Sequence, residues 1–467
     1  MRGSTLCLRT SPPGDPEAHG LILREDNLDH DIVSLALPVV GENLLVMMVL
    51  FVNTLLVGWL KDPEALAAVS LGGLMINIAN SLFSALATAT TAVVARAIGA
   101  KDHRRARTAS AQAILLAFIA AGLLVAGLWP MAERFLTLMG ANEDIVQLGS
   151  RYLRIILSTS FMGFCLMVLN GIMRGSGDTR NPLFITLIMN LWNVGAAVVL
   201  IFGVGPFEGL GVIGAGVATA SARLIGSLLA FYCLFAGKTS IRISPRDLAH
   251  WHKDVAATLV KLSLPTAADA LVTRTGSTLF MRIISALGPE TLAAHQIAVS
   301  VESLSFMPGW GLATAAATLT GQCLGAKKPR LAERAIRRTL ILSLIVMSAI
   351  GIAFAVWGRQ IVTVFGSTPE VLDMAGVAVR LAALEQGTIA IVMVLSGTLR
   401  GAGDTRTPML VTFFGVLFFR VAVVYLFAIV LAWGLAGVWL GTAVDWAARS
   451  ALVFYLFRRG RWKKLEL

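Results

Sequence analysis

Long apolar stretches alternate with short polar connections over most of the chain. Twelve of these stretches reach about 20 residues, enough for a helix to cross the roughly 30 Å hydrocarbon core of a bilayer. Helices are expected rather than strands, because an isolated strand would leave its backbone groups unpaired in lipid. The pattern therefore predicts twelve membrane-spanning helices. Their expected ranges are 32–60, 65–98, 108–130, 147–173, 181–203, 211–236, 255–287, 291–324, 334–358, 371–399, 407–432 and 435–457.

Composition also indicates an integral membrane protein. Hydrophobic residues make up 56% of the chain and charged residues only 14%, whereas roughly a quarter of the residues of soluble proteins are charged. The first thirty residues contain the stretch SPPGDPEAHG and are expected to form a disordered tail. No basic segment followed by a short apolar run and a cleavage site is visible, so the first span is expected to be permanent.

Positive charge is distributed unevenly among the connections. At least 20 lysines and arginines lie in the connections after the even-numbered spans and in the C-terminal tail, against 3 in the other connections. By the positive-inside rule, both termini are expected in the cytoplasm and the protein in the plasma (inner) membrane. This topology explains the net charge of +12, so no nucleic-acid partner is expected.

Short motifs return at an offset close to half the length of the chain. MRGSGDTRNP at 173–182 returns as LRGAGDTRTP at 399–408, with seven of ten positions identical. IGAK at 98–101 returns as LGAK at 324–327, at the same offset. Six spans fall within one offset, so both halves enter from the same side and form parallel repeats.

The repeats predict two six-helix lobes with a cavity between them. The expected domains are an N-terminal tail at 1–30, an N-lobe at 31–237, a cytoplasmic linker at 238–254, a C-lobe at 255–458 and a basic cytoplasmic tail at 459–467.

The repeated turn is predicted to be structural. Its glycines permit a tight reversal, and Asp178 or Asp404 can cap the following helix or bond to the local backbone. Pro182 and Pro408 fall near the first turn of that helix, where proline is tolerated.

Several motifs, in order along this duplicated frame, resemble the multidrug and toxic compound extrusion (MATE) family of secondary transporters, in its prokaryotic form. The longest is LAAHQIAVSVESLSFMPGWGLATAAATLTGQCLGAKKP at 292–329, joined by both RG(S/A)GDTR turns and by GVIGAGVAT at 211–219. The resemblance covers essentially everything after residue 30. It implies two lobes that form a V-shaped cavity, and export of mostly cationic amphiphiles in exchange for protons or sodium.

Ionisable side chains inside the spans are the candidates for ion coupling, since each costs at least a few kcal/mol in lipid. Glu42 in the first span and Asp269 in the seventh occupy equivalent positions of the two repeats, and structural pairing with a neighbouring helix is their alternative role. Glu302 lies deep in the eighth span. Glu385 lies about 22 Å from Arg400, near the midplane, and is the leading candidate for a carboxylate that takes up and releases a proton.

For several charged residues in the spans, a structural role is weighed against one in transport. Asp269 and Arg274 are five residues apart, about 140° around a helix, so each is expected to pair with another helix. Structural pairing is also favoured for Arg420 and Asp445, well inside the last two spans. His295 lies near the outer end of the eighth span, where an interfacial position is the simple alternative to a role beside Glu302.

Four residues are candidates for substrate binding. Asn53 shares a face of the first span with Glu42, and Asn193 lies in the fifth span. Met307 and Trp310 lie beside the bend expected in the eighth span.

The sequence departs from the family pattern in the N-lobe. Proton-coupled members usually have aspartate at the position of Asn53, and again four residues after Asn193, where this chain has Ala197. Because neither residue titrates, the N-lobe proton site that the resemblance implies is not carried over intact. Coupling is then weaker than usual, or it has moved to Glu42, Asp269, Glu302 and Glu385.

The leading hypothesis is a monomeric antiporter that moves small organic cations across the lipid bilayer in exchange for protons or sodium ions. The alternative is a flippase for lipid-linked sugars or peptidoglycan precursors, because Arg274, Arg282 and Arg420 leave open a cationic cavity. An enzyme is disfavoured, since the chain shows no P-loop, no HExxH, no GxSxG and no clustered metal ligands. No catalytic residue, metal or cofactor is therefore expected, and without a filter-like loop a channel is equally disfavoured.

Overall fold

The computed structural model describes residues 28–60, 63–204 and 207–465. Each of the twelve expected spans falls on one helix or on a run of consecutive helical segments. Most of the expected N-terminal tail (1–30) lies outside the described residues, and its last three residues already belong to the first helix.

The N-terminal half contains six long helices and a short hairpin of two antiparallel strands. The helices are α1 (Leu28–Gly58), α2 (Pro63–Gly99), α3 (His103–Leu138), α4 (Glu143–Gly175), α5 (Arg180–Phe202) and α6 (Gly211–Phe235). The strands β1 (Gly203–Val204) and β2 (Phe207–Glu208) join α5 to α6.

The C-terminal half contains the other six spans, of which four are single helices. These are α8 (Lys253–Ser285), α9 (Pro289–Gly325), α10 (Pro329–Val362) and α15 (Gly434–Arg458). The tenth span consists of α11 (Pro369–Ala382) and α12 (Gln386–Gly401), and the eleventh contains α13 (Arg406–Phe414) and α14 (Val421–Tyr425). The one-turn helix α7 (Pro245–Leu248) lies in the connection between the halves.

Within the described residues, ten helices are long and apolar enough to cross a membrane. The two remaining spans, α9 and α15, carry charged side chains well inside the helix: Glu302 in α9, and Asp445 and Arg449 in α15. Both helices contribute to two of the hydrophobic clusters of the C-terminal half. Their lower hydropathy is that of helices which face protein rather than lipid.

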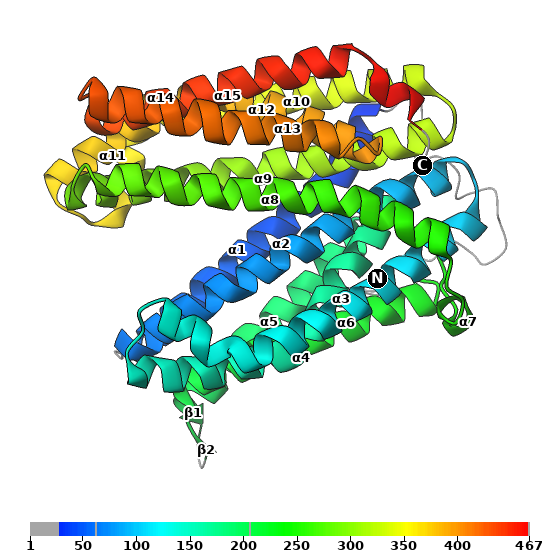
Figure 1. Cartoon of the computed structure of the whole chain (residues 1–467), viewed down its shortest axis with the longest axis horizontal. Helices are drawn as coiled ribbons and strands as arrows, with labels where there is room; N and C mark the ends of the chain where they lie inside the picture. The colour runs from blue at the N-terminus through cyan, green and yellow to red at the C-terminus, as the bar shows by residue number, and fades with distance from the viewer. Residues whose placement is uncertain (1–27, 61–62, 205–206, 466–467) are drawn as a thin grey trace, which may run out of the picture.

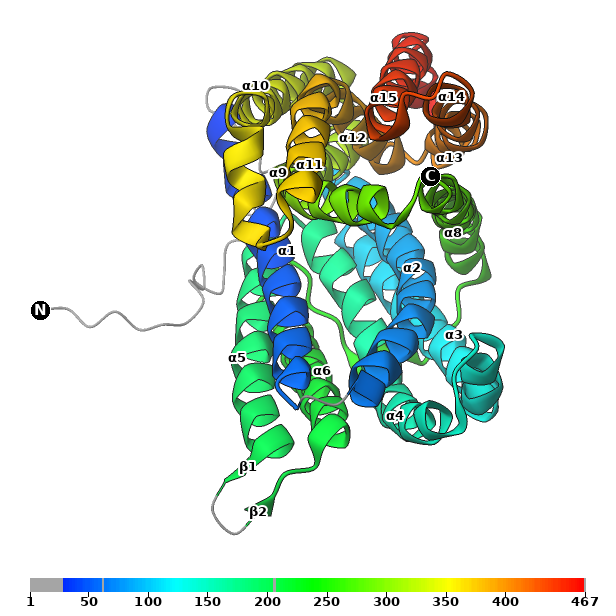
Figure 2. The ribbon, with the colours of Figure 1, turned by 90° about the vertical axis from the view of Figure 1, so that its left-hand side faces the viewer.

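The helices form two lobes that diverge from one end and give the molecule a V shape (Figure 1). The lobes meet near the α4–α5 and α12–α13 turns, an end that we call the vertex, and they separate towards the β1–β2 hairpin, an end that we call the open end. Figure 2 faces the open end and shows α1 and α2 of the N-lobe beside α9 of the C-lobe. This confirms the predicted all-α architecture of two six-helix lobes, to which the short hairpin adds the only strands in the described part of the chain.

The first helix of each repeat crosses to the opposite lobe at the vertex. Ile32, Leu35 and Ala36 of α1 pack in a cluster with α9, α10, α12 and α15. Leu259 and Leu262 of α8 pack in a cluster with α2, α3, α4 and α6. The lobes are therefore held together at the vertex by an exchange of two half-helices.

The repeated IGAK and LGAK motifs bring α2 and α9 into direct contact at the vertex. A Cβ atom at Gly99 would overlap the backbone oxygen of Gln322, and a Cβ atom at Gly325 would overlap that of Arg96. The residues of the two contacts are related by the same offset as the repeated turns, so the contacts are equivalent under the internal repeat. Only glycine permits this approach of the two backbones.

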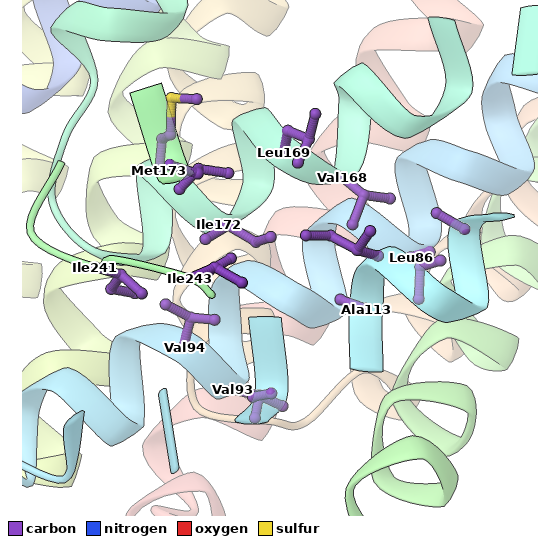
Figure 3. Close-up of a cluster of buried hydrophobic side chains, with 14 of the residues drawn as sticks. Leu86, Val93, Val94, Ala113, Val168, Leu169, Ile172, Met173, Ile241 and Ile243 are labelled. Carbon is purple, nitrogen blue, oxygen red and sulfur yellow. The ribbon is translucent and has the colours of Figure 1, made fainter. Parts of the chain in front are cut away.

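The predicted linker (238–254) is anchored to the N-lobe. Its residues Ile241 and Ile243 are buried in the same cluster as Ile172 and Met173 of α4, as the close-up in Figure 3 shows. The linker therefore follows the N-lobe closely rather than running free between the lobes.

The described part of the predicted C-terminal tail (459–467), up to residue 465, also packs on the molecule. A short helical turn holds Trp462, which is 1% exposed and stacks on Phe457 with a ring distance of 5.2 Å. Beyond it, the backbone oxygen of Leu465 accepts a hydrogen bond from Arg96 of α2, so the tail connects the lobes at the vertex.

Spans 10 and 11 are not the uninterrupted α-helices that the apolar pattern predicts. Span 10 tightens into a 3₁₀ turn at Ala383–Glu385. Span 11 contains two π-helical segments, Gly415–Arg420 and Leu426–Val430. Hydropathy detects none of these changes, because they alter the hydrogen bonding of the helix and leave its apolar character unchanged.

The repeat explains the first π-helical segment. The turns before spans 5 and 11 recur at the common offset of the repeat. The backbone of Leu200 in span 5 contacts Gly214, and the backbone of Phe427 in span 11 contacts Gly437 in the same way. The sequence separation between Leu200 and Phe427 is one residue longer than the offset of the repeat. Span 11 thus holds one extra residue relative to span 5, and a π turn accommodates such an insertion within a helix.

Candidate functional site

Two carboxyl groups meet in the interior of the C-lobe. Glu302 of α9 is 8% exposed, and Glu385, at the 3₁₀ turn of span 10, is 1% exposed. The two carboxyl groups lie close enough for each to act on the other, and one buried oxygen of each, Glu302 Oε1 and Glu385 Oε2, has no hydrogen-bond partner among the described residues. Two carboxylates this close repel each other. A proton or another cation bound between them removes the repulsion.

Three further charged groups surround this pair. Asp445 of α15 accepts hydrogen bonds from Arg420 Nε at 2.8 Å and from Arg449 Nε at 2.7 Å. Both guanidinium groups also lie over the ring of Trp446, at 5.5 Å and 4.6 Å from its centroid. The structural pairing predicted for Arg420 and Asp445 is therefore observed. Arg420 ends the first π-helical segment, and its charge acts on both Glu302 and Glu385.

The buried charges of this cluster do not balance. With every group ionised, the three acids and two arginines carry a net charge of −1. A net charge away from water is costly. One proton or one other monovalent cation neutralises the cluster, and the uncompensated charge sits on the facing pair Glu302 and Glu385.

The equivalent acids Glu42 and Asp269 form ion pairs close to the vertex. Glu42 pairs with Arg174 at 2.7 Å and accepts a hydrogen bond of 3.3 Å from Asn170, both on α4. Asp269 pairs with Arg400 of α12. Asp269 therefore pairs across helices, as predicted, and not with Arg274.

Both arginine partners come from the repeated RG(S/A)GDTR turn, a role that the sequence analysis missed. The signal was present in the chain, because Asp269 follows Glu42 at almost the same offset by which Arg400 follows Arg174. An acid and a base that return together at nearly one offset indicate the same ion pair in each lobe.

Of the two roles predicted for the aspartates of the turns, the structure shows the bond to the local backbone, since each lies one residue before the N-cap threonine of the following helix. Asp178 Oδ1 accepts a hydrogen bond from the backbone of Asn181 at 3.0 Å, and Asp404 Oδ1 accepts one from Thr407 at 3.0 Å. Gly177 has a φ of 88°, which favours glycine. Burial in this connection raises the pKa of Asp178 above its ordinary value.

The polar residues predicted in the N-lobe lie apart from the C-lobe acids. Asn193 is buried and donates a hydrogen bond of 3.4 Å to Thr219 of α6. Asn53 is partly exposed on α1, and Ala197 is fully buried in a hydrophobic cluster. The N-lobe positions where the family usually has aspartates thus offer no carboxylate in this chain.

Three predicted residues of α9 have different surroundings. Trp310 is 57% exposed and Met307 is partly exposed, so both are open to a ligand or to lipid. His295, for which an interfacial position was considered, is buried within the protein. His295 is 2% exposed and packs between the rings of Phe280 and Trp439, at 5.5 Å and 5.7 Å.

The duplicated helical lobes and the charged cluster buried between membrane-spanning helices define the class of multi-pass transporters built from internal repeats. The sequence profile of the MatE family matches residues 38–199 and 265–426, one segment in each half. The chain belongs to the MatE family.

Known proteins agree with this assignment. The chain is 31% identical over 93% of its length, and 93% of the relative, to the probable multidrug resistance protein NorM of Thermotoga maritima. It is 28% identical to the multidrug resistance protein PmpM of Pseudomonas aeruginosa, with 86% and 84% of the two chains covered. Its fold matches the crystal structure of MATE in complex with MaD3S, with a TM-score of 0.87, 23% identity and coverage of 94% and 97%. The chain is thus a multi-pass membrane transporter, not an enzyme.

Proposed function

We propose that this transporter is an antiporter that exports cationic or lipophilic drugs and other toxic organic compounds in exchange for protons or sodium ions. The observation that carries the proposal is the facing pair Glu302 and Glu385 in a buried cluster that lacks one positive charge. The two multidrug resistance relatives described above support export of organic compounds.

The pair suits exchange because the cluster has a net charge of −1. Either the coupling ion or a cationic substrate can neutralise that charge, but not both at once. A proton or sodium ion on Glu302 and Glu385 neutralises the cluster, and its release leaves a net negative charge there that favours a cationic substrate. Binding of one cation therefore disfavours binding of the other, which is the requirement for antiport.

Glu42 and Asp269 take part in coupling in a different way. Each is held by an arginine of the vertex turns, at Arg174 and Arg400. Such a carboxylate becomes free to bind an ion only when its ion pair opens. We therefore assign these two acids to the step in which the lobes rock between the two sides of the membrane.

Orientation follows from the positive-inside rule. We place the vertex, with both termini, on the cytoplasmic side of the plasma (inner) membrane, and the open end on the outside. The structure then represents the outward-facing state, in which substrate leaves and the coupling ion enters.

The test is transport into proteoliposomes with proton and sodium gradients imposed separately. The proton gradient or the sodium gradient is expected to drive ethidium accumulation by the wild type. The Glu385→Gln and Glu302→Gln variants are expected to show no such accumulation. Glu133→Gln is the matched control, since Glu133 pairs with Arg154 on an exposed face near the open end. Equal accumulation by Glu385→Gln and wild type would contradict the site, and lipid scrambling without ethidium transport would favour a lipid flippase.

A further inference from the structure

The centre of the N-lobe contains an arginine that the coupling mechanism does not use. Arg223 lies at the midpoint of α6, twelve residues or about 18 Å from either end of the helix. An arginine side chain is too short to reach water at either membrane surface from that depth. The positive-inside rule therefore does not explain Arg223, which by default marks a functional position.

No carboxylate among the described residues forms an ion pair with Arg223, and its one ionisable neighbour there is the phenol of Tyr152 on α4. Helices α5 and α6 contain no acidic residue, and the acids of α4 lie in its first turn. In the described part of the chain, the only hydrogen bond of the Arg223 side chain is one of 3.4 Å from Nη1 to Ser160 Oγ on α4. A guanidinium has five N–H donors, so most of its capacity is unused.

The surroundings of Arg223 supply hydrogen-bonding groups instead of charges. Its stem packs on Gly163 of α4, which leaves room for it. Thr219 lies one turn away on the same face of α6 and is bonded to Asn193 of α5. Arg223 and Thr219 both keep part of their surface open, whereas Ser160 behind them is fully buried.

An arginine on α15 of the C-lobe, Arg449, has an acidic partner within its own helix and gives a comparison for Arg223. On α15, Asp445 lies four residues before Arg449 and pairs with it. On α6 the residue four before Arg223 is Thr219, which carries no charge. The N-lobe thus has a positive charge without an ion-pair partner on α6, while the buried cluster of the C-lobe lacks one positive charge.

We propose that Arg223, with Ser160, Thr219 and Asn193, forms an anion-binding site in the N-lobe that takes the carboxylate or phosphate group of a transported compound. Arginine presents parallel N–H groups that match either anion in a bidentate geometry. The substrate class is then an organic compound with a cationic or apolar body and one anionic group. This inference rests on the proposed export function, because it names the substrate that the two lobes carry.

The test is equilibrium binding to the purified protein in phosphatidylcholine nanodiscs, which contain no anionic lipid. Two pairs of fluorescent probes differ only in the anion: norfloxacin with its methyl ester, and flavin mononucleotide with riboflavin. The wild type is expected to bind the anionic member of at least one pair about tenfold more tightly or better. Arg223→Gln is expected to abolish that preference, and Arg154→Gln, at an exposed ion pair, to keep it.

Thr219→Asp tests the same site without removing the arginine. It places a carboxylate four residues before Arg223, at the spacing of Asp445 and Arg449, and is expected to remove the anion preference while the protein stays folded. Equal affinity for both members of both pairs in the wild type would overturn the proposal, as would an unchanged preference in Thr219→Asp. An anion preference without ion-driven transport would keep the site and reject the antiport function; ethidium transport without an anion preference would do the reverse.

Discussion

At the scale of single residues, the four candidate acids form two pairs that differ in their partners. Glu42 and Asp269 are each matched by one arginine, whereas Glu302 and Glu385 face each other and share the influence of Arg420. A paired carboxylate has its charge balanced by its arginine, whereas two facing carboxylates leave one negative charge uncompensated, which is why we propose the cation site at Glu302 and Glu385. The sequence identified all four as candidates, but depth in the span could not separate these roles.

Removing the base of a vertex ion pair should destabilise the protein. Arg400→Gln removes the ion-pair partner of buried Asp269 and, within the described residues, leaves it only the charge of Arg449, at a cost of about 1–3 kcal/mol. We expect a lower melting temperature in detergent, followed by fluorescence-detected size-exclusion chromatography after heating.

The control is an exposed ion pair of the same chemistry. Arg359 and Asp373 are 2.6 Å apart, and both side chains are more than half exposed, so Arg359→Gln should cost less than about 1 kcal/mol. An equal loss of thermal stability in both variants would mean that the vertex pair has no special structural role.

At the scale of elements, two features position the proposed coupling site, and neither was predicted. The 3₁₀ turn in span 10 carries Glu385, and the π-helical segment in span 11 ends at Arg420. Hydropathy predicts that a span exists and where it approximately ends, but it does not predict the hydrogen-bonding pattern within the helix. The extra residue of span 11 was detectable only by comparison with span 5, once the contacts of both helices were known.

The contact between α2 and α9 depends on two glycines, which gives a test at this scale. Gly99→Ala adds a Cβ atom that would overlap the backbone of Gln322, so α2 and α9 must separate at the vertex. We expect the variant to shift the population from the outward-facing state to one with an open vertex. Spin-label distances across the vertex would measure this shift.

Gly122→Ala on α3 is the matched control for that substitution. A Cβ atom at Gly122 meets no atom within 4 Å, so this change should leave the distances unchanged and stabilise the helix by about 0.5–1 kcal/mol. Identical distance distributions in Gly99→Ala and wild type would show that the two glycines do not hold the vertex closed.

At the scale of the whole molecule, the duplicated architecture was predictable and its connections were not. Apolar runs and repeated motifs indicated two lobes of six helices, which the structure shows (Figure 1). They did not indicate that α1 and α8 exchange half-helices between lobes, because the apolar face of a helix does not specify its partner. The packing of the tail through Trp462 was missed for the same reason.

The tail should contribute to closure of the vertex. Deletion of residues 460–467 removes buried Trp462 and the hydrogen bond from Arg96 to Leu465. We expect the truncated protein to reach the membrane and to populate the open-vertex state more than the wild type. Faster modification of a cysteine placed in the vertex by a water-soluble reagent would reveal this shift, and an unchanged rate would exclude the tail from closure.

The account as a whole depends on exchange of substrate for a cation held by Glu302 and Glu385. The most direct measurement compares ion-driven accumulation with substrate counterflow for Glu385→Gln in proteoliposomes. Accumulation driven by a proton or sodium gradient should disappear, and exchange of labelled for unlabelled ethidium without a gradient should weaken, because the variant lacks the negative charge that either the coupling ion or the cationic substrate neutralises. Undiminished ion-driven accumulation by Glu385→Gln would contradict the account.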